Sequence, residues 1–179
     1  YDEVADEWTS IAPLNVARCQ HEQVLLQSDE VLVIGGRTLD TGSFKYADSS
    51  DIGPLLNSCE LYDQGEDAWT MTGPMAYARF GHKAVTLSNG KVLVVGGWAY
   101  NPIQGTTPAL TRTCEIYDPT SHRWSPAGKL LVAREAPAVV YMEDLERVYV
   151  MGGDSAITEY LDVATMTWKI SPTRLFGES

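Results

Sequence analysis

Short runs of apolar residues recur along the chain, each bounded by residues that favour turns. The clearest are Val31–Ile34, Val92–Val95 and Val148–Met151. They are rich in β-branched side chains and too short for buried helices, so they predict central strands of a sheet. A weaker strand precedes each run across a turn, at 28–30, 88–90 and 143–145. No segment shows a convincing helical period, and the pattern predicts an all-β fold.

The apolar runs belong to one repeated element. Each run ends in a double glycine and is followed by a short string of acidic and aromatic residues. A tryptophan lies six residues after the aspartate of that string. An arginine leads each copy, ten residues after the preceding tryptophan. The repeated positions are Gly35, Gly36, Tyr62, Asp63 and Trp69, then Gly96, Gly97, Tyr117, Asp118 and Trp124, then Gly152, Gly153, Asp162 and Trp168, led by Arg18, Arg79 and Arg134. Repetition at roughly 45–60 residues indicates an array of supersecondary units, none of which buries its own face alone.

These motifs make the chain similar to the kelch-repeat β-propeller family. The resemblance covers nearly the whole chain and weakens in the third copy, where Leu161 replaces the tyrosine and Pro137 stands in the position of His21 and His82. It implies one blade of four antiparallel strands per copy, and by itself no activity. The implied fold is a kelch-type β-propeller segment. Complete blades are expected at 18–78, 79–133 and 134–173, after the end of a preceding blade at 1–17, with 174–179 as a candidate start of the next.

The repeats leave two faces open. A closed ring of this type takes about six repeats of about 50 residues. Because the sequence starts within a repeat, we expect the chain to be a piece of a longer propeller and not one of several copies that assemble into a ring. Exposed strand edges and apolar faces predict association, so further blades of the same chain or of another copy are expected partners. Each first strand is expected to begin at its leading arginine.

One loop varies while the rest of the repeat keeps its spacing. From the second glycine to the next glutamate the chain runs 24 residues in the first copy (Gly36 to Glu60), 18 in the second and 6 in the third. When a scaffold keeps its spacing and varies one loop, we expect the residues that are specific to the protein to lie on the face that bears this loop. The expected binding residues are Arg18, Arg37, Tyr46, Arg79, Trp98, Tyr100, Asn101 and Arg134. For the arginines, pairing with acidic residues of neighbouring strands is an equal alternative.

Charge narrows the class of partner. The net charge is −11 and the sequence pI is about 4.6, which argues against nucleic acid and against an anionic membrane surface. Arginine and aromatic residues at one face instead suit a protein or peptide partner, and an acidic one in particular. The cysteines, Cys19, Cys59 and Cys114, are odd in number. Unpaired cysteines favour a reducing compartment.

Catalytic motifs are weak in this sequence. Galactose oxidase also has a kelch-type propeller, and its copper needs two histidines and two tyrosines. Here His21 and His82 occupy one repeat position, which favours a scaffold role, and His122 lies in a turn. The pairs Glu60/Asp63 and Glu115/Asp118 also repeat, so they are interpreted as architecture. No catalytic residue, metal or cofactor is therefore expected.

The sequence favours a non-catalytic, protein-binding module. Two alternatives stay open: part of a galactose-oxidase-like or other carbohydrate-active secreted enzyme, and a structural subunit of a larger assembly.

Overall fold

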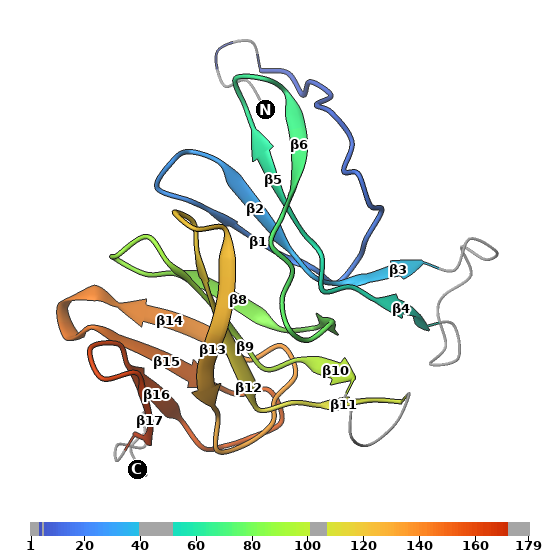
Figure 1. Ribbon diagram of the computed structural model, residues 1–179. Coiled ribbons are helices and arrows are strands. Elements are labelled where there is room, and N and C mark those ends of the chain that lie inside the picture. Colours follow the sequence, from blue (N-terminus) through green and yellow to red (C-terminus); the bar gives the residue numbers. More distant parts are fainter. Residues whose placement is uncertain (1–3, 5, 40–51, 101–106, 172–179) are drawn as a thin grey trace.

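The computed structural model describes residues 4, 6–39, 52–100 and 107–171, and its regular structure is almost entirely β, as the apolar pattern predicts (Figure 1). Each repeat forms one four-stranded antiparallel sheet. The first sheet contains β1 (Glu22–Leu25), β2 (Val31–Ile34), β5 (Cys59–Asp63) and β6 (Ala68–Thr72). The second contains β8 (Lys83–Thr86), β9 (Val92–Val95), β12 (Thr113–Asp118) and β13 (Arg123–Lys129). The third contains β14 (Ala138–Met142), β15 (Arg147–Met151), β16 (Glu159–Asp162) and β17 (Thr167–Ile170), with a single 3-10 turn at Glu143–Leu145.

Two smaller sheets extend from the ends of the first and second sheets. In the first repeat, β3 (Arg37–Leu39) pairs with β4 (Ile52–Leu55). In the second, β10 (Trp98–Tyr100) pairs with β11 (Pro108–Leu110) and with β7 (Arg79–Phe80). Both hairpins project on the same side of the molecule (Figure 1), so the described strands that flank the two longer variable loops lie on one side.

The start of each first strand differs from the sequence expectation. β1, β8 and β14 begin four residues after the leading arginine, at Glu22, Lys83 and Ala138. The arginine segment instead crosses from one sheet to the next. The Arg79 backbone pairs with Ala99 of β10, and its carbonyl oxygen accepts a hydrogen bond from Gly36 of the preceding repeat at 2.9 Å.

The double glycines allow the arginine segment of the next repeat to approach their backbone closely. Gly35 and Gly36 have φ values of 56° and 92°, in the left-handed region. A Cβ on Gly35 would lie 2.8 Å from the Arg79 carbonyl oxygen. Glycine therefore satisfies both the backbone angle and the space that the next repeat takes.

The apolar core lies between neighbouring sheets. One cluster joins Leu32, Ile34 and Leu61 of the first sheet to Val92 and Val94 of the second. A second cluster joins the second sheet to the third, through Leu93, Val95, Val148, Val150 and Leu161. The second sheet thus buries its two faces against different neighbours, as stacked repeats do.

The remaining repeat residues fasten the outer strands. The indole N–H of Trp69, Trp124 and Trp168 donates to the carbonyl oxygen of Ala12, Gly73 and Ala127, respectively. The tryptophans are partly exposed, and Tyr62 and Tyr117 pack on Trp69 and Trp124 with ring centroids 5.0 and 5.1 Å apart. Asp63, Asp118 and Asp162 accept backbone N–H groups of the turns that follow them. Among the described residues, no helix is long and apolar enough to cross a membrane.

Candidate functional site

A buried ion pair joins the leading arginine of each repeat to the glutamate of its third strand. Its members are Arg18 with Glu60 at 2.6 Å, Arg79 with Glu115 at 2.7 Å, and Arg134 with Glu159 at 2.9 Å. The arginine side chains are 0% exposed. Each glutamate also accepts two backbone N–H groups from the segment that precedes its arginine. The pairs therefore tie each crossing segment to the third strand of its own sheet.

The second repeat shows how the two Nη groups of a buried guanidinium are bonded, whereas Arg79 Nε has no hydrogen-bond partner among the described residues. Arg79 donates to the carbonyl oxygens of Gly96 and Thr113 at 3.0 and 2.9 Å, and to the Thr113 hydroxyl at 3.0 Å. The remaining contact is the Glu115 carboxylate. Arg18, Arg79 and Arg134 were expected beside the binding loops, but the structure holds their charged ends inside the protein. A partner approaching the surface does not meet them.

A stack of three planar groups links the two hairpins. The guanidinium carbon of Arg37 lies 5.4 Å from the centre of the Phe80 ring. The Phe80 and Trp98 rings are nearly parallel, at 10°, with centroids 6.3 Å apart. Arg37 comes from β3, Phe80 from β7 and Trp98 from β10, so the Arg37–Phe80–Trp98 stack joins the first repeat to the second.

Arg37 keeps hydrogen-bonding capacity within this stack. Its Nε donates to the Gln20 side chain at 2.6 Å. Its Nη1 is buried and has no hydrogen-bond partner among the described residues. Because Nη1 is buried, a carboxylate of a partner can meet only the exposed part of this guanidinium.

The hairpin face combines this arginine with accessible aromatic and basic groups. We define the hairpin face as Arg37, Phe80, Trp98, Tyr100 and Arg112. Phe80 is buried, Trp98 and Tyr100 are partly exposed, and Arg112 is exposed. Tyr46 and Asn101, which the sequence also assigned to this face, lie outside the described residues.

Sequence reasoning missed two members of the site. Phe80 is the central ring of the stack, and Gln20 orients Arg37. The signal for Phe80 is its place directly after a leading arginine, in Arg79-Phe80-Gly81. Gln20 lies in the corresponding segment of the first repeat.

Two histidines with lowered pKa values lie against the double glycine of the first repeat. His82 is 1% exposed and neither ring nitrogen has a partner among the described residues. Burial, followed by the nearby Arg79 charge, lowers the pKa of His82 to about 3. Burial and then the charge of Arg18 also lower the pKa of His21.

This burial predicts an acid-sensitive stability that depends on His82. Between pH 6.5 and about 3 the unfolded chain binds a proton that the folded chain excludes, so stability falls as the pH falls. The slope is about 1.4 kcal/mol per pH unit, and about 2 kcal/mol should be lost between pH 7 and about pH 5. Urea unfolding of wild type and His82→Gln across this range measures the difference. Equal slopes in wild type and His82→Gln would refute the assignment.

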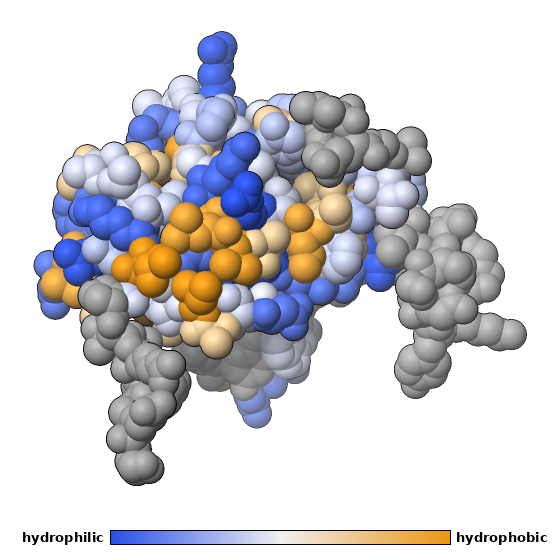
Figure 2. Space-filling model, turned by 90° about the horizontal axis from the view of Figure 1, so that it is seen from below, coloured by the Kyte–Doolittle hydropathy of each residue, from blue (hydrophilic) through white to orange (hydrophobic). Residues whose placement is uncertain are grey.

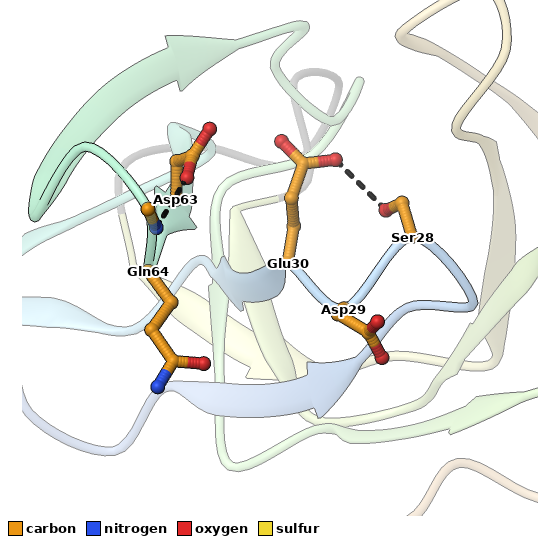
Figure 3. A pocket seen from close by; sticks show the side chains of 6 residues that line it. Ser28, Asp29, Glu30, Asp63 and Gln64 are labelled. Carbon is orange, nitrogen blue, oxygen red and sulfur yellow. Dashed lines mark hydrogen bonds between the residues drawn. The ribbon is translucent and has the colours of Figure 1, made fainter.

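The opposite end of the first sheet carries a shallow acidic pocket. Asp29, Glu30 and Asp63 line it together with Ser28, Gln64 and Gly65 (Figure 3). The polar groups have local partners: Ser28 bonds to Glu30 at 2.8 Å, and Asp63 accepts the Gly65 N–H at 2.7 Å. No group of three or more potential metal ligands is found in the described part of the chain. We interpret the pocket as the space between two polar turns.

Two of the three cysteines, Cys59 and Cys114, lack the environment of a nucleophile. Cys59 and Cys114 are buried, and burial raises the pKa of each thiol to about 12. Such thiols stay protonated and inert. They fill small apolar positions between the sheets.

Known proteins resemble this chain along most of its length. The profile of the Kelch motif matches residues 79–131. Alpha-scruin of Limulus polyphemus is 26% identical over 94% of this chain, and Kelch-like protein 25 of Xenopus tropicalis is 27% identical over 88%. Human Kelch-like protein 15 is 24% identical over 86%. These matches span 18%, 24% and 25% of the respective relatives.

A solved structure shares the fold. The structure of YjhT superposes with a TM-score of 0.70 at 18% identity, over 92% of this chain and 55% of YjhT. At this identity the likeness concerns the fold alone.

Proposed function

Because this chain is a kelch-repeat protein with a propeller-type fold, we propose that it is a non-catalytic protein-binding module that engages its partner through the hairpin face. The observation that carries the proposal is the Arg37–Phe80–Trp98 stack. Arg37 and Trp98 come from the variable segments of two repeats and Phe80 follows a leading arginine, while the repeated arginines are held in internal ion pairs. The face is therefore where this chain differs from a generic repeat.

The chemistry of the face favours an acidic partner segment. Tyrosine, tryptophan and arginine dominate binding hot spots because they combine large contact area with directed polar groups. The partly exposed Arg37 and the exposed Arg112 offer donors to carboxylates. In a protein of net charge −11, positive charge gathered at one face would also steer acidic ligands toward it.

A peptide array tests this function directly. The labelled chain is applied to 15-residue peptides that differ stepwise in aspartate and glutamate content. We expect acidic peptides that contain an aromatic residue to bind most strongly, and binding to weaken as salt is raised. Trp98→Ala should weaken binding by at least about tenfold, as hot-spot truncation does.

Two further variants separate charge from fold. Arg37→Met should remove the preference for acidic peptides while leaving the urea midpoint close to wild type. Arg123→Met removes one exposed charge at the opposite end of β13, where Arg123 pairs with Asp118, and should bind normally. Peptide binding that is unchanged in both Trp98→Ala and Arg37→Met would exclude the hairpin face.

A further inference from the structure

The hairpins β1–β2 and β8–β9 end in turns of one design. In the second repeat, Leu87 donates its N–H to the Lys91 carbonyl oxygen at 2.8 Å, and its own carbonyl oxygen accepts the Gly90 N–H at 2.9 Å. The first repeat has the same two bonds at 2.9 and 3.1 Å, with Asp29 in the place of Gly90. Both of these residues have left-handed φ values, 66° at Asp29 and 78° at Gly90. The two turns therefore share one backbone form and differ in the side chains that they carry.

The turn of the second repeat also ties neighbouring sheets together. The Gln27 side chain donates to the Ser88 carbonyl oxygen at 3.0 Å, and the Ser88 hydroxyl lies 2.7 Å from the hydroxyl of Tyr141. The Thr86 hydroxyl donates to the Leu25 carbonyl oxygen at 3.1 Å. The tips of β1–β2, β8–β9 and β14–β15 accordingly lie in one row on the left of Figure 1, away from the β3–β4 and β10–β11 hairpins. A backbone change in the middle turn would disturb contacts on both of its sides.

This turn carries the Asn-Gly pair of the sequence, Asn89 followed by Gly90. Asn89 is exposed, and Ser28 takes its place in the turn of the first repeat. Gly90 has no side chain to shield its backbone nitrogen from the side-chain carbonyl carbon of Asn89. The Lys91 N–H donates to Asn89 Oδ1 at 3.1 Å, which draws electron density away from that carbon. A backbone nucleophile and an activated amide are therefore adjacent, at an exposed turn.

We propose that Asn89 is a modification site, at which the Gly90 backbone nitrogen attacks the Asn89 side chain and the side chain is deamidated. The Gly90 nitrogen bonds to Asn89 Cγ and loses its proton to solvent, while the side-chain nitrogen leaves as ammonia. Water then opens the resulting five-membered succinimide at one of its two carbonyl groups, which yields aspartate or isoaspartate. No group is oxidised or reduced. This turn is separate from the hairpin face, and the inference does not rest on the proposed function.

The reaction requires the turn to open. The Leu87 carbonyl oxygen holds the Gly90 N–H, and the nitrogen can attack only after this hydrogen bond breaks. Local segments of a protein open at a smaller free-energy cost than the whole fold. Folding therefore slows the reaction at Asn89 without abolishing it.

Isoaspartate would loosen the turn. Its main chain runs through the former side chain and is one carbon longer, and the length of a hairpin loop sets which turn can close it. The two bonds of Leu87 then no longer fit, and Ser88 loses its alignment with Gln27 and Tyr141. Aspartate at the same position keeps the original backbone, and its carboxylate can still accept the Lys91 N–H. The two products should therefore differ in stability.

Peptide mapping of the full folded chain tests the site. Trypsin releases residues 84–91, and deamidation raises the mass of this peptide by about 1 Da. We expect Asn89 to be modified at least about tenfold faster than Asn15 and Asn57, because valine and serine follow those residues and only Asn89 precedes glycine. The rate should rise with pH, because the attacking nitrogen must lose its proton. Urea should raise it further, because it removes the protection of the turn.

Two variants separate charge from backbone length. Asn89→Ser is the matched control, because Ser28 fills this place in the first repeat, and its urea midpoint should stay at the wild-type value during ageing. Asn89→Asp adds the charge alone and should also keep that midpoint. The deamidated fraction of aged wild-type protein, isolated by anion exchange, contains isoaspartate and should unfold at lower urea than Asn89→Asp. Apolar side chains gathered on the underside of the molecule (Figure 2) favour association, so all species are compared at one low protein concentration.

Either of two results would overturn the proposal. One is an Asn89 that, in the folded chain, is modified no faster than Asn15 and Asn57, since the turn would then block the reaction. The other is a deamidated fraction as stable as Asn89→Asp, since the longer backbone would then have no effect on the contacts between the sheets.

Discussion

Arg79→Met is expected to lower the free energy of unfolding by about 3–5 kcal/mol, the loss typical of breaking one side of a buried ion pair. The variant leaves the Glu115 carboxylate in the interior without its counter-charge. It also orphans the Gly96 and Thr113 carbonyl oxygens that Arg79 now satisfies. Methionine nearly fills the volume of the removed side chain, so the loss reports on polar contacts more than on a cavity. Urea unfolding of the full chain measures it.

Lys83 provides the matched control for this variant. It also forms an ion pair, with Glu22 at 2.7 Å, but its side chain is 39% exposed. Because water screens such pairs, Lys83→Met should change stability by less than about 1 kcal/mol. If Arg79→Met were as mild as Lys83→Met, the buried pairs would not be the fastening of the repeats. A double variant with Glu115→Leu should recover part of the loss, since it removes the orphaned charge.

The repetitive part of the fold could be predicted from the sequence because strand position follows the apolar runs. Val31–Ile34 and Val92–Val95 are β2 and β9 with the expected bounds, and Val148–Met151 lies within β15. These runs are confined on both sides by turn residues, so their register has little freedom. The all-β, propeller-type expectation is confirmed on this basis.

The leading arginines show that the position of a residue within the repeat does not by itself define its structural role. Their fixed distance from a tryptophan is equally compatible with a loop-mouth residue and with an internal one. The choice depends on where the chain bends after residue 79, and the bend is set by Gly36 of a different repeat. A fixed spacing, however, is itself a signal of architecture, and it favours the internal ion pair.

The aromatic stack could not be read from the sequence. Phe80 and Trp98 are 18 positions apart, and they meet because β7 pairs with β10 in a register that places Trp98 opposite Phe80. Strands of two or three residues are too short to show alternation. The variable loop indicates that one face of the protein is distinctive. The contacts among the side chains of that face, however, arise from packing between repeats.

Trp124→Ala is expected to lower the free energy of unfolding by about 3 kcal/mol, near the lower end for buried tryptophans. The lower end applies because Trp124 is partly exposed. Its ring packs against the cluster between the first two sheets and on Tyr117. Its indole N–H donates to the Gly73 carbonyl oxygen at 2.9 Å, which fastens the outer strand of the second sheet to the end of the first. Chemical unfolding followed by far-ultraviolet circular dichroism measures the change.

Trp124→Phe divides this loss into packing and hydrogen bonding. Phenylalanine retains an aromatic ring against Tyr117 and removes the N–H, so it should cost about 1 kcal/mol for the lost hydrogen bond plus a smaller packing loss. Met71→Ala on β6 is the control, because that side chain is 54% exposed and should change stability by less than about 0.5 kcal/mol. Equal midpoints for wild type and Trp124→Ala would mean that the conserved spacing from Asp118 to Trp124 has no part in joining the sheets. A loss shared between the two Trp124 variants would place most of the fastening in the single bond to Gly73, and a loss confined to Trp124→Ala would place it in the ring.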